Sequence, residues 1–237
     1  MRPTNNPGPD RRAQLDILQQ KIVACKKCPR LIAYCREVAR IKRRAYLDWE
    51  YWGKPVPSFG DPNARLLILG LAPAAHGANR TGRMFTGDRS GEWLYRALWR
   101  AGYANQPEST SVDDGLRLDG AWITAPVRCA PPANKPTPEE QRRCRPFIER
   151  ELALLDRARV YLALGQIGYQ AAAGLLGVRP RPRFAHGLEV PVADRPGAAA
   201  RTLLCSYHVS QQNTFTGRLT EDMLDQVLAR ARRLSGI

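Results

Sequence analysis

Residues 65–71 read RLLILGL, and this apolar run, with the glycine-rich loop that follows it, decides the fold of the chain. Three further apolar runs are of the same kind, at residues 121–125, 160–164 and 202–207. Segments with apolar residues at helical spacing flank these runs, at residues 13–44, 91–101, 138–156, 166–175 and 220–234. Short buried strands that alternate with amphipathic helices are typical of a parallel sheet covered by helices. The sequence therefore predicts an α/β fold.

The domain organisation follows from length and composition. A chain of 237 residues more often closes one core than two. We predict a flexible tail at residues 1–12, which are rich in proline, asparagine and glycine, and a single domain at residues 13–237. Residues 187–200 are expected to form an exposed hairpin or loop rather than a linker.

The charge balance is strongly basic. Lys and Arg number 37 against 22 Asp and Glu, which gives a net charge of +15 and favours a polyanionic partner. A ribosome-associated or membrane-surface protein would have the same balance. No apolar run approaches the roughly 20 residues of a membrane span, and the first ten residues lack a signal peptide's hydrophobic stretch. We expect a soluble cytoplasmic protein that associates with the nucleoid.

The loop at residues 70–88, directly after the first predicted strand, is the first candidate site. Ligands of open parallel sheets collect beyond the carboxyl ends of the strands, where this loop lies. Its glycines allow a close approach of the backbone to a ligand, Arg80 and Arg83 can reach phosphates, and Phe85 offers a face to a base. The loop has neither a Walker nor a dinucleotide motif. The alternative is a flexible surface loop.

Four cysteines form a second constellation. Cys25 and Cys28 make a Cys-x-x-Cys pair, and Cys129 and Cys144 follow far downstream. Four thiolates suit a tetrahedral zinc ion or a four-iron cluster, and the pair alone would fit a redox motif. A disulfide framework is less favoured, because nothing marks the chain as secreted. Cys35 and Cys205 are expected to be buried thiols.

The segment at residues 206–220 is the third candidate. His208 directly follows the last predicted strand, and amides and hydroxyls that can bind phosphates or base edges come after it. A lone histidine is more often structural, but this position at the pocket side favours a functional role. His76 and His186 have no such support, and we expect both to be structural.

Taken together, these three motifs resemble those of the type-B, or family-five, uracil-DNA glycosylases, which are iron–sulfur members of the uracil-DNA glycosylase superfamily. Residues 70–88 match the first family motif almost throughout, and residues 212–214 with 216–218 match the second. The resemblance runs from Cys25 to about Thr220. It implies a three-layer α/β/α sandwich on a central four-stranded parallel sheet. It also implies a 4Fe-4S cluster held by the four cysteines of the second constellation.

The resemblance further implies roles for residues in the three loops. Most relatives place an acidic residue or an asparagine near Ala74 to activate water, whereas residues 72–75 of this chain read APAA. Asn134 would then bind the attacking water, with Asp88 near it, and His208 would hydrogen-bond the carbonyl oxygen of the base. The implied substrate-binding residues are Gly70, Ala72, Ala74, Phe85 and Asn213. The implied DNA-binding residues are Arg80, Arg83, Gln212, Thr216 and Arg218.

Two positions depart from the family pattern. Val209 follows His208 where the family usually has proline, which would loosen the loop. Residues 125–126 read AP where other branches of the superfamily carry a base-reading asparagine, so strict selectivity for uracil is not implied.

The predicted function is a monofunctional DNA-repair glycosylase, which flips uracil or another deaminated base from double-stranded DNA and hydrolyses its N-glycosidic bond. We expect it to act as a monomer. Three alternatives remain from the sequence. They are a type-A uracil-DNA glycosylase, a non-enzymatic nucleic-acid-binding protein stabilised by zinc, and a redox iron–sulfur protein.

Overall fold

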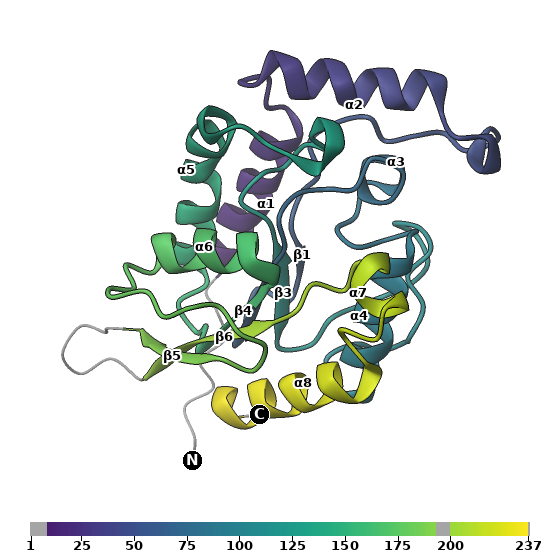
Figure 1. The fold of residues 1–237 in the computed structure, drawn as a ribbon. Helices are drawn as coiled ribbons and strands as arrows, with labels where there is room; N and C mark the ends of the chain where they lie inside the picture. Colours follow the sequence, from purple (N-terminus) through teal and green to yellow (C-terminus); the bar gives the residue numbers. More distant parts are fainter. Residues whose placement is uncertain (1–8, 193–199, 237) are drawn as a thin grey trace.

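A computed structural model describes residues 9–192 and 200–236 as helices that cover one mixed sheet (Figure 1). The sheet has six strands in the order β1-β3-β2-β4-β6-β5. They are β1 (Phe59–Gly60), β2 (Leu66–Leu69), β3 (Ala121–Thr124), β4 (Val160–Leu164), β5 (Glu189–Val192) and β6 (Arg201–Ser206). The four runs predicted as strands are β2, β3, β4 and β6, and they pair in parallel.

The prediction of a four-stranded parallel sheet is incomplete, because the sheet has an additional antiparallel strand at each edge. The two-residue strand β1 pairs with β3, and β5 pairs with β6. Strand β1 is too short to leave a hydrophobic pattern, and β5 carries Pro191, which sheets accept at an edge. Strands β5 and β6 agree with the predicted hairpin at residues 187–200, of which residues 193–199 lie outside the described part.

All predicted helices are present. They are α1 (Pro9–Val23), α2 (Pro29–Ile41), α4 (Arg89–Arg100), α5 (Pro138–Leu154), α6 (Gly165–Leu175) and α8 (Glu221–Ser235). The sequence did not predict the short helices α3 (Ala78–Thr81) and α7 (Gln211–Phe215) or the 3₁₀ turns at Arg44–Tyr46 and Pro132–Asn134. Helix α1 begins at Pro9, and Arg11 forms an ion pair with Asp156 at 2.7 Å, so helical structure begins within the range predicted as a tail. Residues 1–8 lie outside the described part.

The sheet separates two hydrophobic cores. Alternate residues of a strand face opposite sides, so Leu66 and Ile68 of β2 join one core while Leu67 and Leu69 join the other. The first core contains the apolar faces of α4 and α8, and the second contains those of α1, α5 and α6. Figure 1 shows these two groups of helices on opposite sides of the strands. The architecture is therefore a three-layer α/β/α arrangement.

The carboxyl ends of the parallel strands place the candidate loops at one edge of the sheet. Strand β2 leads into residues 70–88, β3 into the segment with Cys129 and Asn134, and β6 into His208 and α7. Parallel strands end at the same edge, so the three loops that carry the candidate motifs, after β2, β3 and β6, converge there. Across the described residues, none of the helices has the length and apolarity that a membrane span requires.

Candidate active site

His208 and Phe85 are brought together at this edge. Their ring centroids lie 6.2 Å apart with the planes tilted by 35°. Two glycines make room for them, because a Cβ atom at Gly70 would lie 2.9 Å from the Phe85 ring and one at Gly165 would lie 3.0 Å from the Cβ of His208. Any other residue at these positions would push the rings out of place. The predicted association of the first loop with His208 is thus present in the structure.

His208 is held as an uncharged imidazole. Burial lowers the pKa of its side chain to about 4, since the charged form loses hydration in this environment. Its carbonyl oxygen accepts a hydrogen bond of 2.8 Å from the side-chain amide of Asn213. Asn213, predicted to bind substrate, therefore fixes the backbone of His208. At neutral pH the ring offers one N–H donor and one acceptor nitrogen.

Backbone strain marks two of the predicted site residues. Phe85 has φ +53° and Asn134 has φ +56°, and the neighbouring Ala133 has φ +52°. Residues other than glycine adopt this left-handed region infrequently, and such outliers gather at functional sites. Asn134 is exposed, and its side-chain amide makes no hydrogen bond to any residue that the structure describes. That amide is available to bind water or a ligand.

Asp88 has a structural task in addition to its position in the first loop. It is the N-cap of α4, and its Oδ1 accepts a hydrogen bond of 3.0 Å from the backbone N–H of Gly91. Burial raises the pKa of its carboxyl group, although the backbone donors of Gly91 and Ser90 oppose this shift. A Cβ atom at Gly77 would lie 2.0 Å from Oδ2 of Asp88, so the carboxylate packs directly against the first loop.

Arg80 lies inside the protein, where it cannot reach a phosphate without a rearrangement. It is 3% exposed, and its guanidinium donates to the carbonyl oxygens of His76 at 2.8 Å and Gly87 at 2.5 Å. The rings of Tyr46 and Trp49 lie 3.9 and 4.1 Å from its Cζ. In this arrangement Arg80 supports the first loop from within, and its contact with a phosphate stays a prediction.

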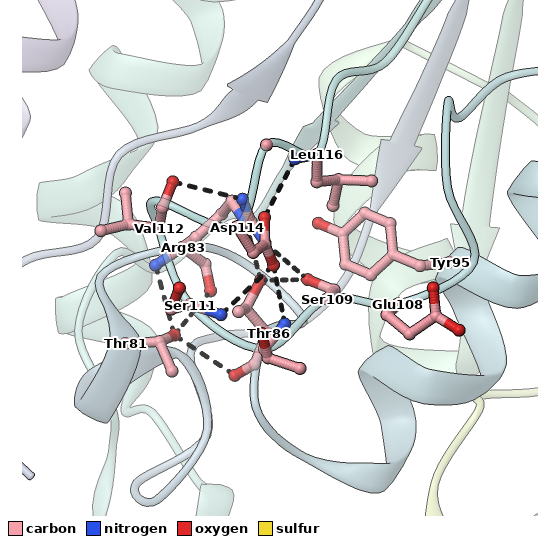
Figure 2. Close-up of polar contacts among 12 residues, drawn as sticks. Thr81, Arg83, Thr86, Tyr95, Glu108, Ser109, Ser111, Val112, Asp114 and Leu116 are labelled. Atoms are coloured by element: carbon pink, nitrogen blue, oxygen red, sulfur yellow. Dashed lines mark hydrogen bonds and ion pairs between the residues drawn. The ribbon is translucent and has the colours of Figure 1, made fainter.

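Arg83 is likewise buried, at 3% exposed, and it lies at the centre of the polar network in Figure 2. Its guanidinium donates to Asp114 at 2.6 Å and to the hydroxyls of Thr86 and Ser109, each at 2.9 Å. Burial acts to raise the pKa of Asp114, but the hydrogen bond from Arg83 and backbone donors outweigh it and lower the pKa to about 2. The guanidinium is committed to this carboxylate, and the phosphate contact of Arg83 likewise stays a prediction.

The loop around α7 presents the other predicted DNA-binding residues to solvent. Gln212, Thr216 and Arg218 are all exposed. Phe215, which the sequence analysis did not single out, is 67% exposed, and the guanidinium of Arg89 lies 4.7 Å from its ring. An exposed aromatic ring beside cations is a surface that can contact both bases and phosphates.

The remaining predicted substrate residues lie where the first loop leaves β2. Gly70 is buried and donates its N–H to the carbonyl oxygen of Thr124 on β3. The carbonyl oxygen of Ala74 accepts a hydrogen bond from the backbone N–H of Asn79, and Ala72 packs against the small hydrophobic core around Cys35 and Cys129. The first loop thus lies between the sheet edge and the cysteine region.

Cys25, Cys28, Cys129 and Cys144 line one small cavity, although more than 100 residues separate the first pair from the second. Most of the other lining residues are apolar, with Lys27, Arg128 and Arg143 as cations. Burial raises the pKa of Cys144 to about 11, and Arg128 opposes that shift. In the described part of the chain, no group of three or more His, Cys, Asp or Glu side chains could hold a metal ion as placed. The four cysteines therefore border one cavity, and their role as ligands stays a prediction.

Ion pairs and hydrogen bonds fasten the Cys25–Cys28 turn to α5. Arg30 forms an ion pair of 2.7 Å with Glu140, which also completes the capping box of α5 with Thr137. Arg143 donates to the carbonyl oxygen of Lys27 at 3.0 Å. Cys35 and Cys205 are both buried as expected, and a hydrogen bond with Cys35 is the first cause that raises the pKa of Cys129.

A buried ion pair beside this cavity was not predicted. Arg128 pairs with Glu151 of α5, and the two also bind the hydroxyls of Ser58 and Thr124. Glu151 further accepts a hydrogen bond of 3.0 Å from Gln19 of α1. The network connects α1, α5 and the end of β3. The pattern of the sequence does not distinguish these buried charged residues from solvated ones. Only the position of Arg128 next to Cys129 could have indicated that its side chain is buried.

The sandwich and its loops define a class of protein. The model of the Uracil DNA glycosylase superfamily matches residues 57–232, which include the sheet, the first loop and the His208 segment. The chain belongs to this superfamily, and the predicted class of enzyme, a uracil-DNA glycosylase of DNA repair, is confirmed.

Curated relatives place it more narrowly. The chain is similar to the Type-5 uracil-DNA glycosylase of Mycobacterium tuberculosis, with 55% identity over 93% of this chain and 81% of the relative. It is 53% identical to the Type-5 enzyme of Thermus thermophilus over 92% of this chain and 97% of the relative. For the Type-5 enzyme of Pyrobaculum aerophilum, the identity is 44% over 95% of each chain.

Proposed function

We propose that this site excises uracil, and other deaminated bases, from double-stranded DNA in the manner of a Type-5 enzyme. The observation that carries the proposal is the uncharged His208 held against Phe85 at the carboxyl edge of the sheet. A flipped base can stack on the ring of Phe85, and the backbone around Gly70 and Ala72 can contact the edge of that base. The enzyme is proposed to act as a monomer on nucleoid DNA.

His208 is proposed to stabilise the leaving group. When the N-glycosidic bond breaks, both bonding electrons go to the base and its carbonyl oxygen gains negative charge. A donor fixed in advance at that oxygen lowers the barrier, because it does not have to reorganise during the reaction. A neutral imidazole has one N–H for this purpose, and Asn213 fixes the backbone that carries it.

Asn134 is proposed to bind the water that attacks the sugar. Its amide is exposed and unbonded among the described residues, and its strained backbone holds it on the loop after β3. Strands β3 and β6 are three strand spacings apart in the sheet, about 14 Å at the usual spacing. We propose that a sugar with its base fits between Asn134 and His208, which follow these two strands. Asp88 then acts as a positioning residue through its cap and its contact with Gly77.

The affinity for DNA is proposed to come from the loop around α7 and from the net charge of +15. Gln212, Thr216 and Arg218 would contact the backbone beside the vacated position, and Phe215 extends from the same loop. Contacts of Lys and Arg with phosphate release counterions, so affinity should fall steeply with salt.

Excision on a panel of single-lesion duplexes tests the proposed function. We expect alkali-labile sites at uracil, and faster excision opposite guanine than opposite adenine, because a mismatched base costs less to flip. Hypoxanthine and xanthine duplexes measure how far selectivity extends beyond uracil. Binding of these duplexes without any abasic product would support the non-enzymatic alternative instead.

A 4Fe-4S cluster is proposed in the cysteine cavity. The four thiols fit it, because they converge from distant segments, and the nearby Lys27, Arg128 and Arg143 offset negative charge. Four sulfurs around one zinc would have to lie within about 4 Å of each other, whereas a cluster several atoms across takes wider spacing. The group would join the Cys25–Cys28 turn to the segments around Cys129 and Cys144. It has no proposed part in excision.

Metal analysis of cysteine variants tests the cluster. The purified protein should be brown and contain about four iron atoms per chain. Cys144→Ser should lose the colour and most of the iron, while Cys205→Ser, a buried thiol outside the cavity, should keep both. One zinc per chain in a colourless protein, or equal losses in the two variants, would overturn the proposal. A reversible redox couple together with no excision would favour the redox alternative.

A further inference from the structure

A row of aromatic rings extends from the candidate site along the end of β6. The ring of Tyr207, next to His208, lies 5.1 Å from His186 and 6.1 Å from Phe184, and Phe184 lies 5.8 Å from Tyr169. We call these four residues the aromatic row. Tyr169 is buried, whereas the other three are partly exposed. The row therefore has a covered end and an accessible end.

The row is held rigidly against the sheet. The backbone N–H of Tyr207 donates to Nδ1 of His186 at 3.2 Å, and that of Gly187 donates to the carbonyl oxygen of Cys205 at 2.8 Å. The hydroxyl of Tyr169 donates to the carbonyl oxygen of Pro182 at 2.7 Å. These bonds fix the segment at residues 182–187 beside the end of β6.

Arginines with no carboxylate partner among the described residues flank the aromatic row. The guanidinium of Arg218, in the α7 loop, lies 4.8 Å from the ring of Tyr207. Residues 179–183 read RPRPR, and Arg179, Arg181 and Arg183 are all exposed. Elsewhere, many exposed arginines do have carboxylate partners, as Arg100, Arg143 and Arg145 illustrate. The charge along the row is thus available to an external anion.

Arg181 connects the two features. Its guanidinium lies 3.5 Å from the position of a Cβ on Gly174, so it passes over α6. Its charge also opposes the burial that raises the pKa of Tyr169, which places it near the covered end of the row. Rings and cations therefore run side by side from the α7 loop towards α6.

We propose that the aromatic row and its arginines bind single-stranded DNA next to the site. Unpaired bases stack on partly exposed rings such as Phe184, and their phosphates meet the arginines. The faces of paired bases are covered in a duplex, so rings offered for stacking favour an unpaired strand. This inference rests on the proposed function, because it makes the row an extension of the surface that holds the lesion strand.

Binding of a uracil-free single-stranded oligonucleotide to the full chain tests this proposal by fluorescence anisotropy. Phe184→Leu keeps an apolar side chain but removes the ring, and we expect roughly tenfold weaker binding. Arg181→Ala combined with Arg183→Ala should weaken binding and reduce the slope of log K against log salt by about 1.4. Neither variant should slow excision of uracil from a saturating duplex.

The matched control removes two arginines at the opposite edge of the sheet. Arg117 and Arg159 precede β3 and β4, and their replacement by alanine lowers the net charge equally. This control should bind the single strand within twofold of the unmodified chain. Unchanged binding by folded Phe184→Leu, or an equal loss in the control, would overturn the proposal. If the unmodified chain excises no base but the losses in single-strand binding occur as expected, the proposed function fails and the binding surface stands.

Discussion

Replacing His208 with alanine should slow excision of uracil roughly 100- to 1,000-fold, the usual loss when a fixed donor to a developing anion is removed. The effect should appear in the single-turnover rate at saturating enzyme, with duplex affinity near that of the unmodified chain. His208 contacts Phe85 and Asn213 rather than the exposed Gln212, Thr216 and Arg218, so DNA affinity and the rate of excision can be separated. Equal losses of rate and affinity would contradict its role.

Two controls refine this prediction. His208→Gln retains an N–H donor and should recover part of the lost rate, whereas His76→Ala, at a histidine that hydrogen-bonds Tyr51, should have little effect. The pH profile gives a further check. Because burial lowers the pKa of His208 to about 4, the ring stays neutral above pH 6, and the rate should be level between pH 6 and 8. A tenfold decline per pH unit in that range would mean that the protonated ring is required.

Replacing Asn134 should slow hydrolysis about 100-fold, because a water that is no longer aimed at the sugar attacks far less often. Two variants distinguish the amide from the backbone. Asn134→Ala removes the amide but keeps a side chain at φ +56°, whereas Asn134→Gly removes the amide and relieves that strain. If the amide is required for hydrolysis, both variants should lose activity to the same extent. The glycine variant should nevertheless be more stable against unfolding in urea.

Single-turnover excision by the two Asn134 variants is the measurement. Asn134→Asp, which can still bind water, should retain far more activity than either. Undiminished excision by Asn134→Gly would remove the side chain from the mechanism and leave only the shape of the loop.

The fold was predictable where burial leaves a pattern along the chain. The apolar runs at β2, β3, β4 and β6 are covered on both faces, so nearly every residue in them is hydrophobic. Strand β1 was missed because two residues carry no pattern, and its pairing with β3 depends on tertiary contacts.

The candidate site was predictable in its loops but less so in its charges. Position after a strand identified His208 and Phe85, because topology brings strand ends to one edge. The burial of Arg80 and Arg83 was not predictable, since their partners are carbonyl oxygens and an aspartate about 30 residues away. The sequence around an arginine that supports a loop from within does not differ from the sequence around one that extends to a phosphate.

The positions of Cys129 and Cys144 on either side of Asn134 have a consequence for recognition of damage. Both cysteines line one cavity, so a group that bound them there would close the intervening segment into a loop with two fixed ends. Closing a loop removes conformational entropy before any ligand arrives. With that group bound, the cost of immobilising Asn134 would be borne during folding, and DNA would meet an amide whose freedom is already restricted.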